Sequence, residues 1–489
     1  MEAWIIVVLM DTFADPTPSV LPPLEVCRRA RKSRDPRFDG HFFVAVLTTG
    51  IYCRTTCPVR MPREENVRYF ASAAGAQDSG FRPCRRCRPE CAQRLPEWTL
   101  KSDTVRRALR LIEDGYLNEH KVADLALRMG VSERQLCRLF TQELGASPKT
   151  IAQVLRARLA KNLLLGSGLK HAEIAFHAGY GSVSRFNAEV RRIFDASPRE
   201  IRQKKRAADD RVVLKLPIRG LYDFDWMFEY LKRRALGGLE EVTGRSGNWR
   251  YSRRVPLGCE EGCLHVFQDE ESLGVELPLG GEPLHGMLTR IRRMFDLDAD
   301  GHTIHESLFE DPLLGEWVRA RPGLRVPGAW DGFETAVRAI LGQQVSVERG
   351  TELATRMIAG YGQGWFPHAE QLVQRDIAEL GMPGNRGRAI SSLARQVLDG
   401  SIVLDDAQDF AAAAAQIQSV RGIGPWTANY VRMRVSKDPD AFPDNDWVVM
   451  KALHTDARGA RHRAEAWRPW RAYALMYVWQ ASAVLRQRQ

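Results

Sequence analysis

The sequence predicts a multidomain α+β protein with four folded parts: a small cysteine-rich domain, an all-helical block, a small α+β subdomain and a larger all-helical body. Three observations support this fold class. Six of the nine cysteines lie within residues 27–91, residues 100–203 contain two similar helical segments around a glycine, and short β-branched runs after residue 212 give way to helical periodicity from about residue 284. A chain of 489 residues is also too long for one core.

We place the four parts at residues 23–98, 99–206, 212–284 and 285–489, and we expect residues 1–22 to be disordered or to follow from a start codon placed too early. The apolar run at 4–10 is seven residues long, has no basic flank and precedes a Pro-rich stretch. It therefore fits neither a signal peptide nor a membrane span. We expect a cytoplasmic protein without a membrane partner.

The net charge of +11 is unevenly distributed along the chain. It amounts to +4 over residues 1–98, +10 over 99–206 and −3 over 207–489. A basic excess of this kind favours a polyanionic partner such as nucleic acid, although basic surfaces are also common for solubility alone.

Two short-spaced cysteine pairs, Cys53-x3-Cys57 and Cys84-x2-Cys87, lie in the first part of the chain. In a chain without an export signal, clustered thiols indicate metal ligands rather than disulfides. Two such pairs can close one tetrahedral Zn²⁺ site. We interpret Cys27 and Cys91 as thiols outside the site, and Cys259 and Cys263 have no second pair within reach.

Around these pairs the chain reads Asp35-Pro36-Arg37-Phe38-Asp39-Gly40-His41-Phe42-Phe43, Thr48-Thr49-Gly50-Ile51-Tyr52-Cys53-Arg54, Arg63-Glu64-Glu65-Asn66-Val67 and Gly80-Phe81-Arg82-Pro83-Cys84. This pattern closely resembles the N-terminal domain of the Ada adaptive-response regulators. The resemblance implies that Cys53, the first of the four, accepts a methyl group from a methylphosphotriester in the DNA backbone.

Methyl acceptance fits the chemistry of a zinc-bound cysteine, because coordination keeps the sulfur as a thiolate and the thiolate is the nucleophile. Four thiolates around Zn²⁺ carry a formal charge of −2, and methylation of one leaves −1. We infer that this change relieves repulsion from DNA phosphates and switches on tighter binding. The alternative is a zinc knuckle that only folds the small domain.

The helical block contains two segments that each look like a helix-turn-helix. In the first, residues 122–126 lead through Gly130 to 132–135, where Ser132 and Gln135 have capping-box spacing. In the second, residues 173–180 lead through a glycine turn to 183–190. Together they resemble the AraC-type DNA-binding domain, which places two recognition helices in successive major grooves. The side chains that could then reach base edges or phosphates are Arg134, Gln135, Arg138, Ser184, Arg185 and Asn187.

Two alternatives stay open for this block. For any one of these side chains, a solvated helix face is the plainer interpretation. A ligand-responsive AraC regulator would need a ligand-binding domain ahead of the block, whereas the sequence has a compact Cys-rich unit there. His171 and His177 are interpreted as surface or packing residues rather than ligands.

Near the C-terminus, Val420-Arg421-Gly422-Ile423-Gly424-Pro425-Trp426-Thr427-Ala428 predicts a turn between two helices, and Phe442-Pro443-Asp444-Asn445-Asp446-Trp447 follows. Glycine lets the main chain approach a DNA phosphate closely, and the next helix presents its N-terminus. Two further motifs are Ala339-Ile340-Leu341-Gly342-Gln343-Gln344-Val345-Ser346-Val347 and Trp470-Arg471-Ala472-Tyr473-Ala474-Leu475-Met476-Tyr477-Val478-Trp479.

These four motifs resemble the helix-hairpin-helix DNA glycosylases of the 3-methyladenine DNA glycosylase II (AlkA) class over residues 212–489. The resemblance implies that Asp446 is the catalytic carboxylate, with Asp444 as the alternative. It also implies a base pocket formed by Trp426, Tyr430, Trp447 and Trp479, a hairpin at Gly422 and Gly424 that contacts DNA, and Gln344 at the position of the wedge that enters the duplex. Some relatives bind a monovalent cation at the hairpin.

The hairpin continues Pro425-Trp426 without the lysine of lyase-type relatives, which favours a simple hydrolase without strand cleavage. The chain also lacks the Pro-Cys-His-Arg motif of O6-methylguanine repair.

We therefore predict a monomeric bacterial protein that combines an Ada-type regulator with an AlkA-type glycosylase. It would be associated with the nucleoid and bind double-stranded DNA and RNA polymerase. The alternative is a transcription regulator with a catalytically inert glycosylase half.

Overall fold

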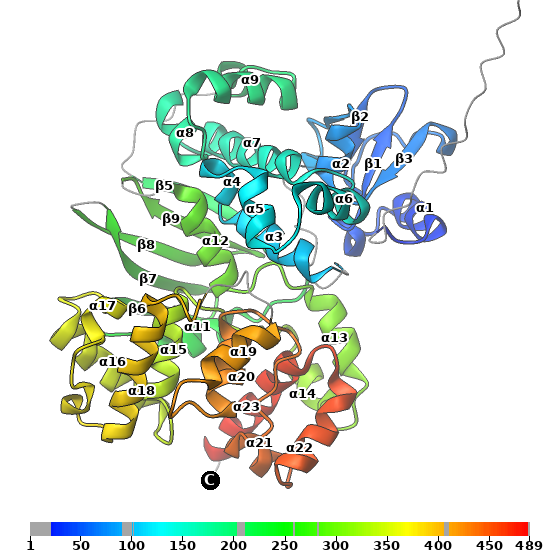
Figure 1. The fold of residues 1–489 in the computed structure, drawn as a ribbon. Coiled ribbons are helices and arrows are strands. Elements are labelled where there is room, and N and C mark those ends of the chain that lie inside the picture. Colours follow the sequence, from blue (N-terminus) through cyan, green and yellow to red (C-terminus); the bar gives the residue numbers. More distant parts are fainter. Residues whose placement is uncertain are drawn as a thin grey trace, which may run out of the picture.

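The computed structural model describes residues 21–89, 100, 102–202, 211–257, 260–280, 283–404 and 410–487. Residues 1–20, Cys91 and Cys259 lie outside these ranges, and with them the expectations placed on them. The four parts follow one another in chain order, from the cysteine-rich domain and helical block at the top of Figure 1 to the helical body at the bottom. The predicted mixed fold class is confirmed.

The cysteine-rich domain is built on a four-stranded sheet in the order β3-β1-β2-β4, in which only the β2–β4 pair is parallel. Its elements are α1 (Leu24–Ser33), η1 (Pro36–Phe38), β1 (Phe43–Val46), β2 (Ile51–Cys53), η2 (Glu64–Asn66), β3 (Val67–Phe70), α2 (Ala73–Asp78) and β4 (Arg82–Pro83). Phe43, Tyr52 and Ala76 form a small buried cluster between the sheet and α2. The Sγ of Cys27 is buried and donates to the carbonyl of Pro22 at 3.3 Å.

The helical block contains two helix-turn-helix units joined by one long helix, α7. Its helices are α3 (Asp103–Glu113), α4 (Tyr116–Glu119), α5 (Val122–Arg128), α6 (Glu133–Leu144), α7 (Pro148–Gly166), α8 (His171–His177), α9 (Val183–Phe194) and α10 (Pro198–Ile201). The turns pass through Gly130 and Gly179, whose φ angles of 73° and 84° are in the left-handed region that favours glycine. Ser132 and Ser182 cap α6 and α9 with their side chains, as the sequence pattern predicts for the first unit.

The α+β subdomain is a five-stranded antiparallel sheet in the order β5-β9-β8-β7-β6 with α11 packed on it. Its elements are β5 (Arg211–Pro217), α11 (Phe224–Lys232), β6 (Glu240–Arg245), β7 (Asn248–Leu257), β8 (Glu260–Asp269) and β9 (Ser272–Pro278). Burial alternates along β5 and β7, because one face of the sheet packs on the core and the other faces solvent.

The C-terminal body is helical and contains two hydrophobic clusters. Its elements are α12 (Leu284–Met294), α13 (Gly301–Phe309), α14 (Gly315–Ala320), α15 (Gly332–Leu341), α16 (Val347–Tyr361), α17 (Ala369–Leu372), η5 (Ile377–Leu380), α18 (Gly384–Leu398), α19 (Phe410–Gln418), α20 (Pro425–Arg434), α21 (Trp447–Ala452), α22 (Ala457–Ala464), η6 (Glu465–Trp467) and α23 (Arg471–Gln487). One cluster joins α23 and α12 to the sheet, and the other joins α15, α16, α18 and α20.

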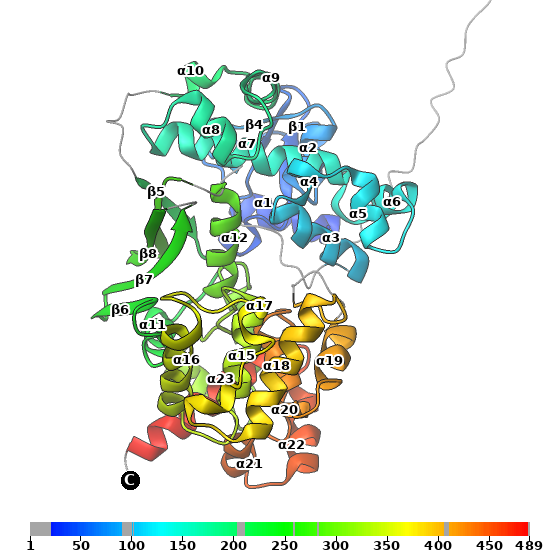
Figure 2. The ribbon, with the colours of Figure 1, turned by 60° about the vertical axis from the view of Figure 1, so that its left-hand side comes forward.

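Polar contacts connect the helical block to the parts on either side of it. Figure 2 shows α12 between the sheet and the helical block, and the Oγ1 of Thr289 on α12 donates to the carbonyl of Glu113 at 3.1 Å. Arg293 forms an ion pair with Asp114 at 3.1 Å. On the other side, the Oγ of Ser72 in the cysteine-rich domain donates to the carbonyl of Leu144 at 2.5 Å.

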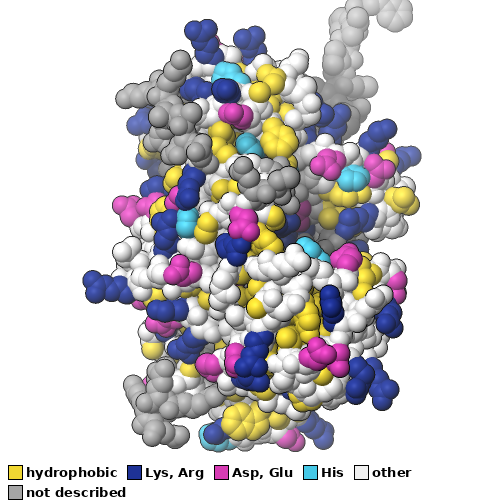
Figure 3. Space-filling model, turned by 90° about the vertical axis from the view of Figure 1, so that its left-hand side faces the viewer, with side chains coloured by type: hydrophobic (Ala, Val, Ile, Leu, Met, Phe, Trp, Pro, Cys, Tyr) yellow, Lys and Arg dark blue, Asp and Glu magenta, His cyan; other side chains and the backbone are white. Residues whose placement is uncertain are grey.

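On the face shown in Figure 3, Lys and Arg side chains spread over the height of the molecule with Asp and Glu among them. Over the described ranges, no helix has the length and apolar character needed to cross a bilayer.

Candidate functional sites: a four-cysteine centre and an aromatic cavity

The four predicted zinc ligands meet at the end of the small sheet. The parallel pairing of β2 with β4 sets Tyr52 beside Pro83, and the N–H of Cys84 donates to the carbonyl of Tyr52 at 3.0 Å. This register places the residues that follow, Cys53 and Cys84, side by side. The sulfurs of Cys53, Cys57, Cys84 and Cys87 all lie within 4.8 Å of one another.

This donor set fits Zn²⁺, because four thiolates at mutual contact distance form the tetrahedral arrangement of a structural zinc site. The backbone N–H of Arg54 donates to the Sγ of Cys87 at 3.4 Å, and the Arg54 guanidinium is paired with the Asp39 carboxylate. Such outer contacts orient a metal ligand and favour its thiolate form. Cys53 is 6% exposed, so its side chain is largely shielded from solvent.

The side chains proposed to read DNA lie on the outer faces of α6 and α9. Arg134, Gln135 and Arg138 on α6 and Ser184, Arg185 and Asn187 on α9 are all exposed. The opposite faces pack inward, with Leu136, Phe140 and Phe186 fully buried. His177 is buried and His171 half-buried, in line with a packing role.

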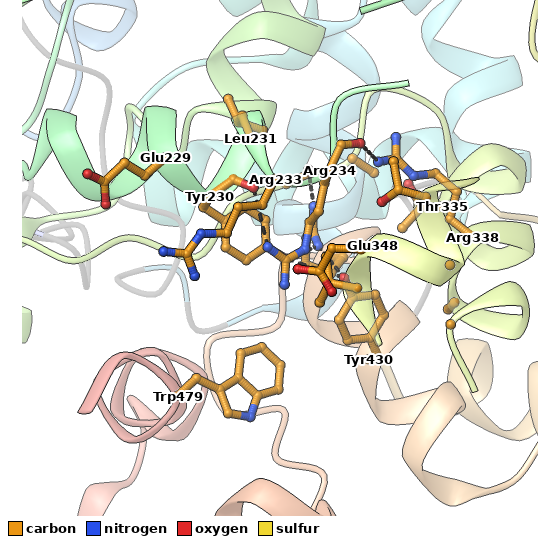
Figure 4. Close-up of a pocket in the computed structure, with 18 of the residues that line it drawn as sticks. Glu229, Tyr230, Leu231, Arg233, Arg234, Thr335, Arg338, Glu348, Tyr430 and Trp479 are labelled. Atoms are coloured by element: carbon orange, nitrogen blue, oxygen red, sulfur yellow. Dashed lines mark hydrogen bonds between the residues drawn. The ribbon is translucent and has the colours of Figure 1, made fainter. Parts of the chain in front are cut away.

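A cavity of about 590 Å³ opens in the C-terminal half. It lies between the two hydrophobic clusters, and Tyr430 packs against both. Figure 4 shows Tyr230 from α11, Tyr430 from α20 and Trp479 from α23 around this cavity. Its wall includes Trp226, Tyr230, Trp426, Tyr430, Asp446 and Trp479.

Five carboxylate residues line this cavity: Glu229, Glu240, Glu334, Glu348 and Asp446. Asp446 is the one that the sequence predicted, and three N–H groups hold it. It is the N-cap of α21, where its Oδ1 accepts from the backbone N–H of Val449 at 2.9 Å. Its Oδ2 accepts from the Nε1 of Trp426 at 2.7 Å, and the Nε1 of Trp479 approaches Oδ1 at 3.4 Å. Asp446 is 6% exposed, so its negative charge sits in a shielded position beside the cavity.

The alternative carboxylate, Asp444, does not line the cavity. It forms an ion pair with Arg461 at 2.5 Å. A carboxylate neutralised by an external arginine is a weaker candidate for stabilising a positive charge inside the cavity than Asp446 is.

The glycine hairpin leads directly into α20. Gly422 has φ 97°, and a methyl group built there would lie 3.1 Å from the Cβ of Ala389. Gly424 is the N-cap of α20, has an ordinary φ of −89° and has open space around it. The Nε2 of Gln343 donates to the carbonyl of Gly422 at 3.3 Å and to the Oγ1 of Thr427 at 2.9 Å, which ties the hairpin to the end of α15.

The aromatic side chains predicted to form a base pocket are not all in one place. Trp426 and Tyr430 are stacked, with ring centroids 5.2 Å apart and an angle of 14° between the rings. Trp479 lies 6.5 Å from Tyr430. Trp447, however, is 63% exposed and does not line the cavity, and the Lys451 ammonium lies 5.1 Å from its ring.

The expectation that Trp447 lines the base pocket is therefore wrong. Asp446 turns toward the cavity as the N-cap, and the next residue of a helix points about 100° around the axis, toward solvent. Gln344 also lies outside the cavity wall. It is exposed at the turn between α15 and α16, with φ 55° in the left-handed region.

Sequence reasoning missed the contribution of α11 to the cavity. Tyr230 of α11 and Arg234 in the turn after that helix line the cavity, together with Arg434 of α20. The Arg234 guanidinium lies 3.7 Å from the centre of the Tyr230 ring. The aromatic run Phe224-Asp225-Trp226-Met227-Phe228-Glu229-Tyr230 was a usable signal, because a helix that buries so many rings must face a large apolar surface or a ligand.

Comparison with known families places three parts of the chain. Residues 26–90 match the metal-binding domain of Ada, residues 125–204 match a helix-turn-helix domain, and residues 213–331 match the AlkA N-terminal domain. The Ada match and the four-sulfur cluster together confirm the prediction of a Zn²⁺ site. These matches define a class of protein in which an Ada-type regulator is fused to an AlkA-type glycosylase.

Known relatives identify the family. A Mycobacterium tuberculosis protein named "Probable bifunctional transcriptional activator/DNA repair enzyme AlkA" is 40% identical over 478 residues, covering 93% of this chain and 96% of that protein. DNA-3-methyladenine glycosylase 2 of Escherichia coli is 34% identical over 274 residues, covering 53% of this chain and 93% of that protein. The bifunctional transcriptional activator/DNA repair enzyme Ada of Escherichia coli is 39% identical over 132 residues, covering 27% of this chain and 36% of that protein. The chain belongs to the family of the bifunctional transcriptional activator/DNA repair enzyme AlkA.

Proposed function

We propose that this protein responds to DNA alkylation in two ways. Its C-terminal half hydrolyses the N-glycosidic bond of alkylated bases such as 3-methyladenine, and Cys53 accepts a methyl group from DNA methylphosphotriesters to switch on transcription. The division of labour follows the ranges 23–98, 99–206 and 212–489. The observation that carries the enzymatic part is the Asp446 carboxylate, held by three N–H groups in a cavity lined with aromatic rings.

A base in duplex DNA is stacked, so it must leave the helix before it can enter this cavity. The stacked rings of Trp426 and Tyr430 offer a flat face for it. A cationic alkylated base gains about 0.5–2 kcal/mol from the indole face. This gain favours damaged bases over normal ones, which carry no charge.

The chemistry then depends on Asp446. As the bond between C1′ and the base nitrogen breaks, its electron pair goes to the base, which leaves uncharged if it was cationic, and positive charge develops on the sugar. The Asp446 carboxylate stabilises that charge and orients a water molecule. The water oxygen bonds to C1′ and releases a proton. Because none of the described residues that line the cavity is a lysine, the reaction ends as hydrolysis without strand cleavage.

The hairpin and the turn before α16 position the DNA. Backbone N–H groups at Gly422 and Gly424 contact a phosphate, as the N-terminus of α20 favours. Gln344, exposed on a strained turn, fills the gap left by the displaced base. Trp447 and Lys451 present an indole and a cation on the surface beside Asp446, and we assign them to the flanking strand. A monovalent cation at the hairpin would be held by backbone carbonyls there.

Methyl transfer takes place at Cys53. Bound Zn²⁺ keeps the cysteine sulfurs as thiolates. The Sγ of Cys53 attacks the methyl carbon of the phosphotriester, a sulfur–carbon bond forms, and the carbon–oxygen bond breaks to leave a phosphodiester anion. The methylated domain repels DNA less, and α6 and α9 then dock in successive major grooves through their exposed polar side chains.

Several expectations about partners belong to the same proposal. The DNA-bound protein contacts RNA polymerase, acts as a monomer and is associated with the nucleoid.

The enzymatic proposal is tested by incubating the full-length protein with duplex DNA that contains 3-methyladenine and measuring base release. Asp446→Asn is the informative variant, because asparagine still caps a helix and has nearly the same size, while it removes the charge and leaves one accepting oxygen in place of two. Asp444→Asn is the matched control. Release by the wild type and the control but not by Asp446→Asn supports the proposal, whereas no release by the wild type defeats it.

A further inference from the structure

Two tyrosine hydroxyl groups meet at one end of the cavity. The Tyr230 oxygen on α11 and the Tyr430 oxygen on α20 lie 3.3 Å apart. The Arg434 guanidinium donates from Nη1 to both oxygens, and its Nη2 donates to the carbonyl of Gly328 at 3.1 Å. Arg434 is 8% exposed, so this polar cluster is fixed and largely shielded from water.

The two hydroxyl groups carry one proton more than the contacts of this cluster can accept. Each phenol carries one proton, and arginine supplies donors only. The contact between the two hydroxyls uses one of the two phenolic protons. Within the described ranges, no other acceptor is bonded to either hydroxyl, so one phenolic proton has no partner within the protein.

Either hydroxyl can donate to the other, and we assign the proton without a partner to Tyr430. Tyr230 is buried at 8% exposure, whereas Tyr430 is half-buried and its ring lies parallel to that of Trp426 beside the cavity. If Tyr230 donates to Tyr430, the Tyr430 hydroxyl donates into the space that a displaced base would fill. Donation from Arg434 to the same oxygen polarises the hydroxyl and strengthens it as a donor.

The charges around this hydroxyl disfavour a cationic base there. The Arg234 guanidinium lies 3.7 Å from the Tyr230 ring centre, and that of Arg434 lies 5.2 Å and 5.4 Å from the Tyr230 and Tyr430 ring centres. Burial raises the pKa of Tyr430, but the positive charges of Arg434 and Arg234 outweigh it and lower the pKa to about 8. The charges acting most strongly on the Tyr430 hydroxyl are therefore those of arginines, in contrast to the carboxylate at Asp446, while Glu240, Glu334 and Glu348 also line the cavity.

We propose that the Tyr430 hydroxyl is a specificity-determining group, which donates a hydrogen bond to a ring nitrogen or carbonyl oxygen of an uncharged damaged purine. Cationic alkylated purines depend instead on stacking against the indoles and on Asp446. The inference rests on the proposed glycosylase activity. One cavity would then bind uncharged damaged bases through a hydrogen bond and cationic ones through stacking and charge.

The test compares two substrates with the same protein preparation. Full-length protein is incubated with duplexes that carry a single hypoxanthine, which is uncharged, or a single 3-methyladenine, which is cationic in DNA, and single-turnover release is measured. Tyr430→Phe keeps the ring and its stacking but removes the hydroxyl. We expect the hypoxanthine to 3-methyladenine rate ratio to fall roughly three- to tenfold, the worth of one hydrogen bond.

Two further variants sharpen the result. Tyr230→Phe should lower the ratio less than Tyr430→Phe, because Tyr430 keeps its own proton. Tyr361→Phe is the matched control, since that hydroxyl donates to the carbonyl of Asp376 outside the cavity, and it should leave the ratio unchanged. A general loss of folding cancels in the ratio, because both rates come from one preparation.

An unchanged or increased ratio in Tyr430→Phe would overturn the inference and leave the glycosylase activity standing. The same holds if the wild type releases 3-methyladenine but no hypoxanthine. Release of neither base by the wild type would instead defeat the proposed function itself.

Discussion

The cysteine centre and the aromatic cavity are built in different ways. The four sulfurs come from the end of β2 and the segments that follow β2 and β4, and residues 53–87 contain all of them. The cavity collects side chains from α11, α20, α21 and α23, which span more than half of the chain. A metal centre of this kind depends on local spacing, whereas a base-binding cavity depends on how distant helices pack. The two sites should therefore respond independently to mutation.

Disruption of the zinc site should have the largest effect. Cys84→Ser removes one of four ligands and, because metal binding and folding are coupled in such small domains, should abolish methyl uptake from alkylated DNA. Base release should stay within about twofold of the wild type, since the cavity has its own hydrophobic clusters. Bound zinc, methyl uptake and base release would be measured on one preparation. A parallel collapse of base release would mean that the two sites are not independent.

Loss of the indole N–H next to the carboxylate should have the next largest effect. Trp426→Phe keeps an aromatic ring but removes the 2.7 Å hydrogen bond to Asp446. A hydrogen bond to a charged group is worth about 1.5–3 kcal/mol, so base release should fall by one to two orders of magnitude. Trp365→Phe, at a ring stacked by Arg254 outside the cavity, is the control and should change little. An equal loss in both variants would point to general destabilisation.

The two hairpin glycines should separate stability from DNA binding. Gly422→Ala forces a side chain onto a backbone with φ 97° and against Ala389, so the free energy of unfolding should fall by about 1–2 kcal/mol. Gly424→Ala meets no strain and no neighbouring atom, so it should leave stability unchanged.

Affinity for duplex DNA is the second property to measure for the two glycine variants. If the main chain at Gly424 approaches a phosphate, the added methyl group should weaken binding in Gly424→Ala even though the fold is intact. Unfolding by denaturant and DNA binding would be measured for both variants. Unchanged DNA affinity in Gly424→Ala would contradict the proposed phosphate contact.

The smallest expected effect is a pH dependence of lesion preference. The Tyr430 hydroxyl contacts Tyr230 on α11 and Arg434 on its own helix. Burial raises its pKa, but the charges of Arg434, of Arg234 in the turn after α11 and of Arg338 on α15 lower it to about 8. As the pH rises through this value, the hydroxyl loses the proton it would donate and gains a negative charge. The rate ratio for hypoxanthine over 3-methyladenine should therefore fall by roughly threefold between pH 7 and pH 9. The rate ratio should not change with pH in Tyr430→Phe. An equal fall of the ratio in that variant would mean that another group titrates.

The sequence alone predicted the cysteine centre almost completely, because Cys53, Cys57, Cys84 and Cys87 lie in two short pairs whose spacing has few uses. It also predicted the helix-turn-helix units, since caps such as Ser132 and turns such as Gly130 are local features. The hairpin and Asp446 were found through motifs.

The rest of the cavity depends on tertiary packing. Tyr230 and Arg234 lie some two hundred residues before Tyr430, and no spacing rule links them. Asp446 lines the cavity whereas its neighbour Trp447 does not, because adjacent residues at the start of a helix face different directions. The hydrogen bonding of the Tyr430 hydroxyl could be assigned only from its distances to Tyr230 and Arg434.

The central claim is that two separate sites act on alkylated DNA in one chain, and a crossed assay tests it most directly. Wild type, Asp446→Asn and Cys53→Ser would each be measured for release of 3-methyladenine and for methyl uptake from phosphotriesters. The account predicts that Asp446→Asn loses base release by about a hundredfold or more and keeps methyl uptake, while Cys53→Ser loses methyl uptake and keeps base release. Full base release by Asp446→Asn, or undiminished methyl uptake by Cys53→Ser, would contradict it.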